Sequence, residues 1–190
     1  MWKDIYCMKS TTKDLVFIAL STTIIIVCSF ITIPFYVPFT MQTFAIFTII
    51  GLLGTKKAFL SVAIYLLLGA IGLPVFSGFQ GWIGSLFGVT GGYLFGFLLT
   101  TFLTGGLLNF FQKRKNLTSF CYFFSMLLGL LVCYAFGTTW YLLIYTNSTG
   151  SISITSVLSL CVFPFILPDI LKLTLSMYVT KVLKKHLYKL

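Results

Sequence analysis

Two ionisable residues, Asp169 and Lys172, lie inside a long apolar segment near the C-terminus of this 190-residue chain. They are three positions apart, so on a helix their side chains share one face. Charges placed within a lipid bilayer cost several kcal/mol unless they pair with each other or face a wet cavity. One interpretation is an ion pair that fixes this helix to its neighbours. We favour a polar ligand site that opens to the outside.

Two prolines, Pro164 and Pro168, precede the charged pair and support the ligand site. A proline interrupts a helix because it lacks a backbone N–H, and an interrupted membrane helix leaves backbone groups free near a cavity. We therefore expect a break just before Asp169. Lys172 lies nine positions before Lys181, which is about 14 Å along a helix. The pair is then expected between the bilayer midplane and the outer leaflet.

A glycine-rich stretch at residues 72–93 is the second concentration of unusual residues. Glycine permits irregular backbone and close approach to a ligand, so residues 78–84 are predicted to form a structured loop in the bundle mouth. The alternative is close helix packing by small residues, which we favour for Gly92 and Gly96. Ligand contacts are expected from the following residues of this stretch: Phe76, Gly78, Gln80, Gly81, Trp82, Gly92 and Tyr93.

Thr40 and Gln42 form a third polar group, at the expected outer mouth of the second apolar segment. Their side chains can cap a helix or bond to neighbouring helices, which would be a structural role. They can equally donate and accept hydrogen bonds toward a small heterocycle. The sequence leaves both roles open.

The composition identifies the solvent of this chain as lipid. Hydrophobic residues make up 58% of it and charged residues only 8%, whereas soluble domains carry about 25% charged residues. The net charge of +10 comes from short basic clusters between apolar runs, which indicates membrane topology rather than nucleic-acid binding. The five cysteines have no CxxC spacing and His186 is the only histidine. We therefore expect no metal, no cofactor and no enzymatic activity.

Six apolar segments predict a single all-α membrane domain over residues 1–190. The expected spans are residues 15–33, 39–54, 58–73, 89–111, 119–145 and 156–183. Every second connection is basic and the others are uncharged, so the positive-inside rule puts both termini in the cytoplasm. The runs are too long and too uniformly apolar for strands of a membrane barrel.

Four motifs in this order and spacing resemble the BioY family of biotin transporters. They are residues 37–42 (VPFTMQ), 72–76 (GLPVF) with the glycine-rich run after it, 88–97 (GVTGGYLFGF) and 167–172 (LPDILK). The resemblance implies an S component of the energy-coupling factor (ECF) class, with a six-helix fold, in a bacterial cell membrane. It also implies biotin capture from outside and docking on a transmembrane coupling protein that two ATPase subunits drive.

Biotin carries a ureido ring, a thioether and a carboxylate tail. In this hypothesis Asp169 accepts from the ureido N–H groups, and Lys172 donates to the ureido oxygen or pairs with Asp169. Thr40, Gln42 and Gln80 add hydrogen bonds, while Phe76, Trp82 and Tyr93 pack on the bicyclic ring and the tail. The alternatives are an S component for another vitamin, such as thiamine or riboflavin, a membrane scaffold without a ligand, and an intramembrane enzyme.

Overall fold

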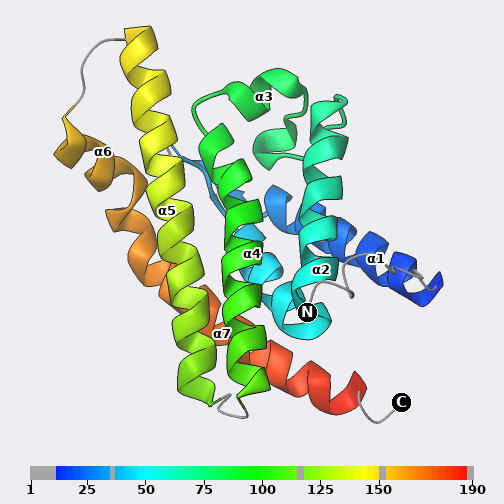
Figure 1. The fold of residues 1–190 in the computed structure, drawn as a ribbon. Helices are drawn as coiled ribbons and strands as arrows, with labels where there is room; N and C mark the ends of the chain where they lie inside the picture. The colour runs from blue at the N-terminus through cyan, green and yellow to red at the C-terminus, as the bar shows by residue number, and fades with distance from the viewer. Residues whose placement is uncertain (1–11, 35–36, 115–117, 150–152, 188–190) are drawn as a thin grey trace.

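Long apolar helices make up almost all of the computed structural model, which describes residues 12–34, 37–114, 118–149 and 153–187 (Figure 1). The helices are α1 (Thr12–Phe30), α2 (Gln42–Ala70), α3 (Ile83–Phe87), α4 (Gly91–Lys113), α5 (Ser119–Thr149), α6 (Ile154–Cys161) and α7 (Phe163–Leu187). In this part of the chain, α1, α2, α4, α5 and the α6–α7 stretch are long and apolar enough to cross a membrane. The expected all-α membrane fold is therefore confirmed.

Helix α2 contains a sharp reversal that joins two of the expected spans. Gly54 has φ 79° and ψ 174° inside the helix, a conformation that glycine reaches without the steric cost of a Cβ. Figure 1 shows the ribbon of α2 turning back at its lower end. The expected spans at 39–54 and 58–73 thus meet without a loop between them. The first half packs on α7 through Thr48 and Ser176 (3.0 Å), and the second half packs on α1.

Helices α4, α5 and α7 alternate in direction along the side of the bundle. The Tyr93 hydroxyl lies 3.2 Å from the Thr138 hydroxyl, and Thr100 donates to the carbonyl of Gly129 at 3.0 Å. Residue numbers therefore rise along α4 as they fall along α5, which makes the two helices antiparallel. Figure 1 shows α7 descending beside the ascending α5.

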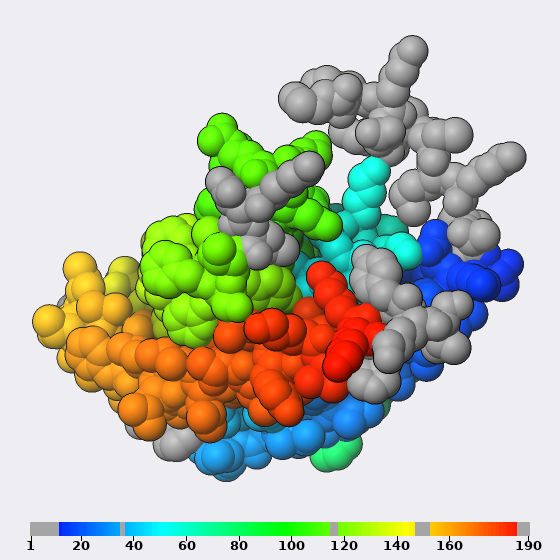
Figure 2. Space-filling view, turned by 90° about the horizontal axis from the view of Figure 1, so that it is seen from below, coloured from blue at the N-terminus to red at the C-terminus, as the bar shows by residue number. Residues whose placement is uncertain are grey.

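Basic side chains gather at one end of the bundle, which we call the basic end. Lys57 in α2 pairs with Asp14 in the first turn of α1 at 2.5 Å, and Lys181 in α7 donates to Ser119 at the start of α5 at 3.4 Å. Figure 2 views this end, where the last turns of α7 lie beside the start of α5. The described basic residues here are Lys13, Lys56, Lys57, Lys113, Arg114, Lys181, Lys184 and Lys185.

The opposite end carries short irregular elements. Strands β1 (Thr32–Ile33) and β2 (Phe39–Thr40) pair antiparallel before α2. The glycine-rich stretch forms a 3-10 turn, η2 (Ser77–Phe79), and the short helix α3. Trp82 takes a positive φ of 100° between them, and its amide donates to the carbonyl of Gly69 at 2.7 Å. The stretch is therefore an ordered cap on this end of the bundle.

The last expected span is broken in a different place from the one predicted. The break falls at Val162, with φ −126° and ψ −58°, between α6 and α7. Pro164 then lies in the first turn of α7, where its missing N–H is not needed. Pro168 lies inside α7, so the expected break just before Asp169 is wrong. The helix continues through the charged pair and holds both side chains on one face.

The other helix ends differ from the expected spans by a few residues, mostly for local reasons. Helix α1 ends at Phe30 because residues 32–33 pair as strand β1. Helix α4 begins at Gly91 rather than at residue 89, and α5 continues to Thr149 rather than ending at residue 145. These shifts leave the order of the apolar segments unchanged.

The buried core draws on side chains of α2, α4, α5 and α7. Phe47, Tyr65, Met126 and Leu173 are among its fully buried side chains. Large apolar residues remain exposed around the outside, for example Leu167 on α7. A water-soluble protein rarely exposes such continuous apolar surface, whereas lipid tails cover it without cost.

Candidate functional site

A buried ion pair on α7 stands at the centre of the candidate site. The ammonium of Lys172 lies 2.8 Å from a carboxylate oxygen of Asp169, and each side chain is only 6% exposed. The i, i+3 spacing brings them to the same face of the helix, as the sequence predicted. A buried pair of this kind is stable only when its remaining donors and acceptors also find partners.

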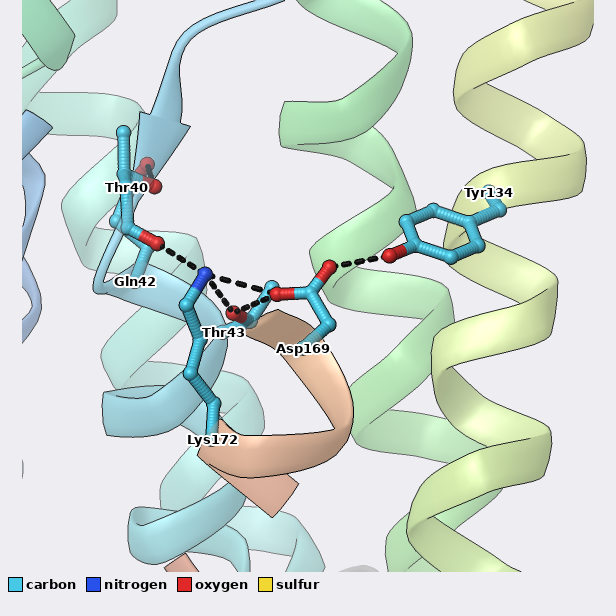
Figure 3. A network of polar contacts seen from close by, with 6 residues as sticks. All are labelled: Thr40, Gln42, Thr43, Tyr134, Asp169 and Lys172. Carbon is cyan, nitrogen blue, oxygen red and sulfur yellow. Dashed lines mark hydrogen bonds and ion pairs between the residues drawn. The ribbon is translucent and has the colours of Figure 1, made fainter. Parts of the chain in front are cut away.

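The ammonium of Lys172 has an acceptor for each of its three hydrogens (Figure 3). It donates to the backbone carbonyl of Thr40 at 2.7 Å, to the Thr43 hydroxyl at 3.3 Å and to Asp169. It also lies 3.6 Å from the ring centroid of Phe39, close enough for a cation–π attraction. Lys172 therefore ties α7 to the junction between β2 and α2.

The carboxylate of Asp169 is held from two further helices. Tyr134 on α5 donates its hydroxyl to one oxygen, and Thr43 on α2 donates to the other at 3.4 Å. Figure 3 shows Tyr134 and Thr43 reaching Asp169 from opposite sides. A carboxylate offers about four acceptor positions, of which these contacts and Lys172 occupy three.

Gln42 holds the same junction through a second chain of hydrogen bonds. The Thr40 hydroxyl donates to the side-chain oxygen of Gln42 at 2.8 Å. The amide nitrogen of Gln42 donates to the Tyr65 hydroxyl at 2.6 Å. These bonds position the Thr40 carbonyl that Lys172 uses, so Thr40 and Gln42 support the ion pair and also line the cavity beside it.

A cavity of about 390 Å³ lies beside the ion pair. This volume is within the range of about 300–1,000 Å³ that small-molecule sites occupy. Its wall is mostly apolar, with a few polar groups at the deep end and along the 76–90 stretch. The lining residues are Thr32, Pro34, Val37, Pro38, Phe39, Thr40, Gln42, Thr43, Phe76, Ser77, Gly78, Gln80, Ser85, Thr90, Tyr93, Leu94, Phe97, Leu130, Cys133, Tyr134, Cys161, Phe165, Asp169 and Lys172.

Most of the residues expected from the sequence lie on this cavity. Asp169, Lys172, Thr40, Gln42, Phe76, Gly78, Gln80 and Tyr93 all line it. Gly81, Trp82 and Gly92 are not among the lining residues. Trp82 is 67% exposed, and a Cβ on Gly81 would lie 2.2 Å from the carbonyl oxygen of Leu73. Gly92 packs against Trp140, where a Cβ would come within 2.2 Å, so its position suits helix packing.

Sequence reasoning missed several groups that line the cavity. Thr43 follows Gln42 directly, so the polar run at residues 40–43 was its available signal. Tyr134 lies in the middle of an apolar helix, where a phenolic hydroxyl at membrane depth was a weaker signal. Phe165 stacks on Phe39 with ring centroids 6.0 Å apart, and no sequence pattern connects those two rings.

The BioY family model matches residues 4–189 of the chain. The chain is similar to the biotin transporter BioY of Thermotoga maritima, with 38% identity over 91% of this chain and 96% of that protein. It is also similar to the probable biotin transporter BioY of Pyrococcus horikoshii, with 40% identity over 72% and 74% of the two chains. Both names describe transport rather than catalysis.

One solved structure resembles the fold along nearly its full length. It is the S-component for biotin from an ECF-type ABC transporter, with a TM-score of 0.81 and 30% identity. The similarity covers 94% of each chain. The family resemblance that the sequence motifs predicted is therefore confirmed, and the apolar helices are those of a membrane protein.

Proposed function

The chain belongs to the BioY family, and we propose that it is an S component that captures biotin for uptake across the cell membrane. The observation that carries this proposal is the Asp169–Lys172 pair beside a cavity of about 390 Å³. A charged pair kept for stability alone needs no open space next to it. Here both residues face a space suited to a small ligand.

The polar end of the cavity suits the ureido group of biotin. Asp169 has about one acceptor position left, which can take a ureido N–H. The hydrogen bond from Lys172 to Thr43, at 3.3 Å, is the longest of the three that Lys172 donates. It is therefore the hydrogen bond that Lys172 can most easily give up in order to donate to the ureido oxygen. A ligand without a matching polar edge would leave Asp169 and Lys172 with unpaired hydrogen-bonding groups. Sites built to hydrogen-bond a ligand bind such a ligand far more weakly.

The remaining walls suit the rest of the ligand. Phe39, Phe165 and Tyr93 provide apolar surface for the bicyclic ring and the aliphatic chain. Ser77 and Gln80 lie along the cap and can donate to the carboxylate tail. In this pose the ring lies deep and the tail points toward the end of the bundle that carries β1, β2 and α3.

We also propose the arrangement of the chain in the membrane as a single domain. The two halves of α2 would cross separately, which with α1, α4, α5 and α6–α7 makes six crossings. The basic end would face the cytoplasm with both termini, because Lys and Arg accumulate on that side. The cavity would then open to the outside, where a vitamin arrives.

Energy for uptake would come from partners. An S component of an ECF-type transporter works with energy-coupling subunits, and we propose a transmembrane coupling protein with two ATPase subunits. No cofactor is required, since biotin is the transported ligand. Copurification from native membranes tests the partners: a coupling protein and ATPases should be retained by the tagged chain.

A screen of free vitamins tests the ligand. The purified protein is titrated with biotin, thiamine and riboflavin in the same detergent. Biotin alone should bind tightly and saturably, because only its ureido group matches Asp169 and Lys172. Tight binding of thiamine or riboflavin, with none of biotin, would refute the proposal.

A further inference from the structure

Two smaller cavities lie at the basic end, apart from the cavity beside Asp169 and Lys172. One, of about 160 Å³, lies between the start of α5 and the end of α7. The other, of about 190 Å³, lies between the α2 turn and the end of α4. Tyr122 and Lys184 line both cavities, so the two cavities adjoin at these two residues.

Two buried hydroxyls in this region lie beside each other and make no hydrogen bond to any third described residue. They are the hydroxyls of Tyr122 and Thr180, whose residues are only 9% and 2% exposed. A buried hydroxyl whose hydrogen finds no acceptor destabilises the folded state, so a native protein seldom keeps two together without a ligand or water. Thr180 lines the cavity between α5 and α7.

Gly51 makes room for these hydroxyls on the first half of α2. A Cβ at this position would lie 1.8 Å from the Tyr122 hydroxyl oxygen and 2.8 Å from the Thr180 hydroxyl oxygen. Both oxygens therefore converge on one point from α5 and α7. A side chain at residue 51 would occupy the place where they meet.

The charges around this point are positive. Lys181 and Lys184 line the cavity between α5 and α7, and no carboxylate is among the lining residues of either cavity. The chain has only three acidic residues. Of these, Asp14 pairs with Lys57 and Asp169 pairs with Lys172, and Asp4 lies outside the described residues. An anionic ligand would neutralise the positive charge of Lys184.

We propose that these cavities form a phosphate-binding site at the basic end, made by Lys184, Lys181 and the hydroxyls of Tyr122 and Thr180. A phosphate group offers several acceptor oxygens, which match two ammonium groups and two hydroxyl donors. The headgroup of an anionic phospholipid is one source of that group, since basic pockets between membrane helices on this side bind such headgroups. A soluble phosphate is the other source.

The test uses the full-length protein in a nonionic detergent, with added lipid counted by native mass spectrometry. Dioleoyl phosphatidylglycerol is compared with dioleoyl phosphatidylcholine, and inorganic phosphate is titrated separately. The variants are Lys184→Gln and the isosteric Tyr122→Phe. Lys185→Gln is the matched control, because it removes the same charge from the neighbouring position, which lines neither cavity. Unchanged biotin affinity reports that each variant is folded.

The wild type should bind one phosphatidylglycerol saturably and in preference to phosphatidylcholine. Lys184→Gln should weaken this binding about tenfold and Tyr122→Phe about fivefold, while Lys185→Gln changes it less than twofold. Inorganic phosphate that binds with the same dependence on Lys184, without any lipid preference, would identify a soluble anion as the source. Equal effects of Lys184→Gln and Lys185→Gln, or no preference for either phosphate probe, would overturn the proposal.

Discussion

The Tyr134 hydroxyl on α5 donates a hydrogen bond to the carboxylate of Asp169 on α7. Together with Thr43 on α2 and Lys172, this contact fixes the carboxylate from three helices. The acceptor that we assign to biotin is therefore oriented before any ligand arrives. Such preorganisation lowers the cost of binding, because fewer side chains must be ordered when the ligand enters.

Tyr134→Phe should weaken biotin binding by about tenfold or more, since hydrogen bonds to charged groups contribute roughly 1.5–3 kcal/mol. The ring remains, so the apolar wall of the cavity is kept. Equilibrium titration of the purified variant measures the effect. Tyr178→Phe is the control, because Tyr178 is 67% exposed on α7 and lies outside the cavity. This variant should bind biotin with the affinity of the wild type.

Replacing both members of the ion pair separates stability from binding. Asp169→Asn or Lys172→Met alone should lower the free energy of unfolding by about 3–5 kcal/mol, because each leaves a buried charge without its partner. The double variant should recover most of that stability. It should still fail to bind biotin, since the charged acceptor and the ammonium donor assigned to the ureido group are both gone.

Thermal unfolding in detergent and biotin titration measure the two properties of the double variant. A ligand-free scaffold makes the opposite prediction, in which the double variant remains fully functional. Tight biotin binding by the double variant would show that the ligand does not depend on the ion pair, whereas a ligand-free scaffold would bind no biotin even as the wild type.

The sequence predicted the centre of the site better than its walls. Asp169 and Lys172 stand out because charge at membrane depth is costly, and their spacing fixes a shared face. Tyr134 does not stand out, since tyrosine is common in apolar helices and its contact with α7 depends on how α5 packs. Gly54 was likewise not recognised, because the sequence alone indicates the end of a span there and not a reversal within one helix.

Gly92→Ala tests whether this glycine serves packing or the ligand. Its Cβ would lie 2.2 Å from the Cβ of Trp140, and overpacking of this kind costs about 1–3 kcal/mol. We expect a lower unfolding temperature and, in the folded fraction, biotin affinity within about twofold of the wild type. Gly106→Ala is the control on the same helix, where a Cβ meets nothing within 4 Å.

Gly106→Ala should leave the unfolding temperature unchanged or raise it, because alanine favours a helix over glycine by about 1 kcal/mol. If Gly92→Ala and Gly106→Ala change the unfolding temperature equally, close packing at Gly92 does not explain the change. A loss of affinity in Gly92→Ala without loss of stability would instead make Gly92 a ligand contact.

Trp82→Ala separates the exposed part of the cap from the cavity wall. Trp82 was expected to pack on the ligand, but it is largely exposed and outside the lining. Its removal should change biotin affinity less than about twofold, as for surface positions in general. Gln80→Ala, on the lining of the same cap, should weaken binding about fivefold through a lost hydrogen bond. If paired titrations show a larger loss of biotin affinity for Trp82→Ala than for Gln80→Ala, the ligand contacts the outer face of the cap instead of the cavity wall.

Isothermal titration of the purified protein with biotin, alongside Asp169→Asn, tests the central claim most directly. Asparagine keeps the size of the side chain but removes the charge that pairs with Lys172. The wild type should bind one biotin per chain with high affinity, and the variant should lose at least about a hundredfold while remaining inserted and folded. Equal affinity in both proteins would contradict the account, because the ligand would then not depend on the buried pair.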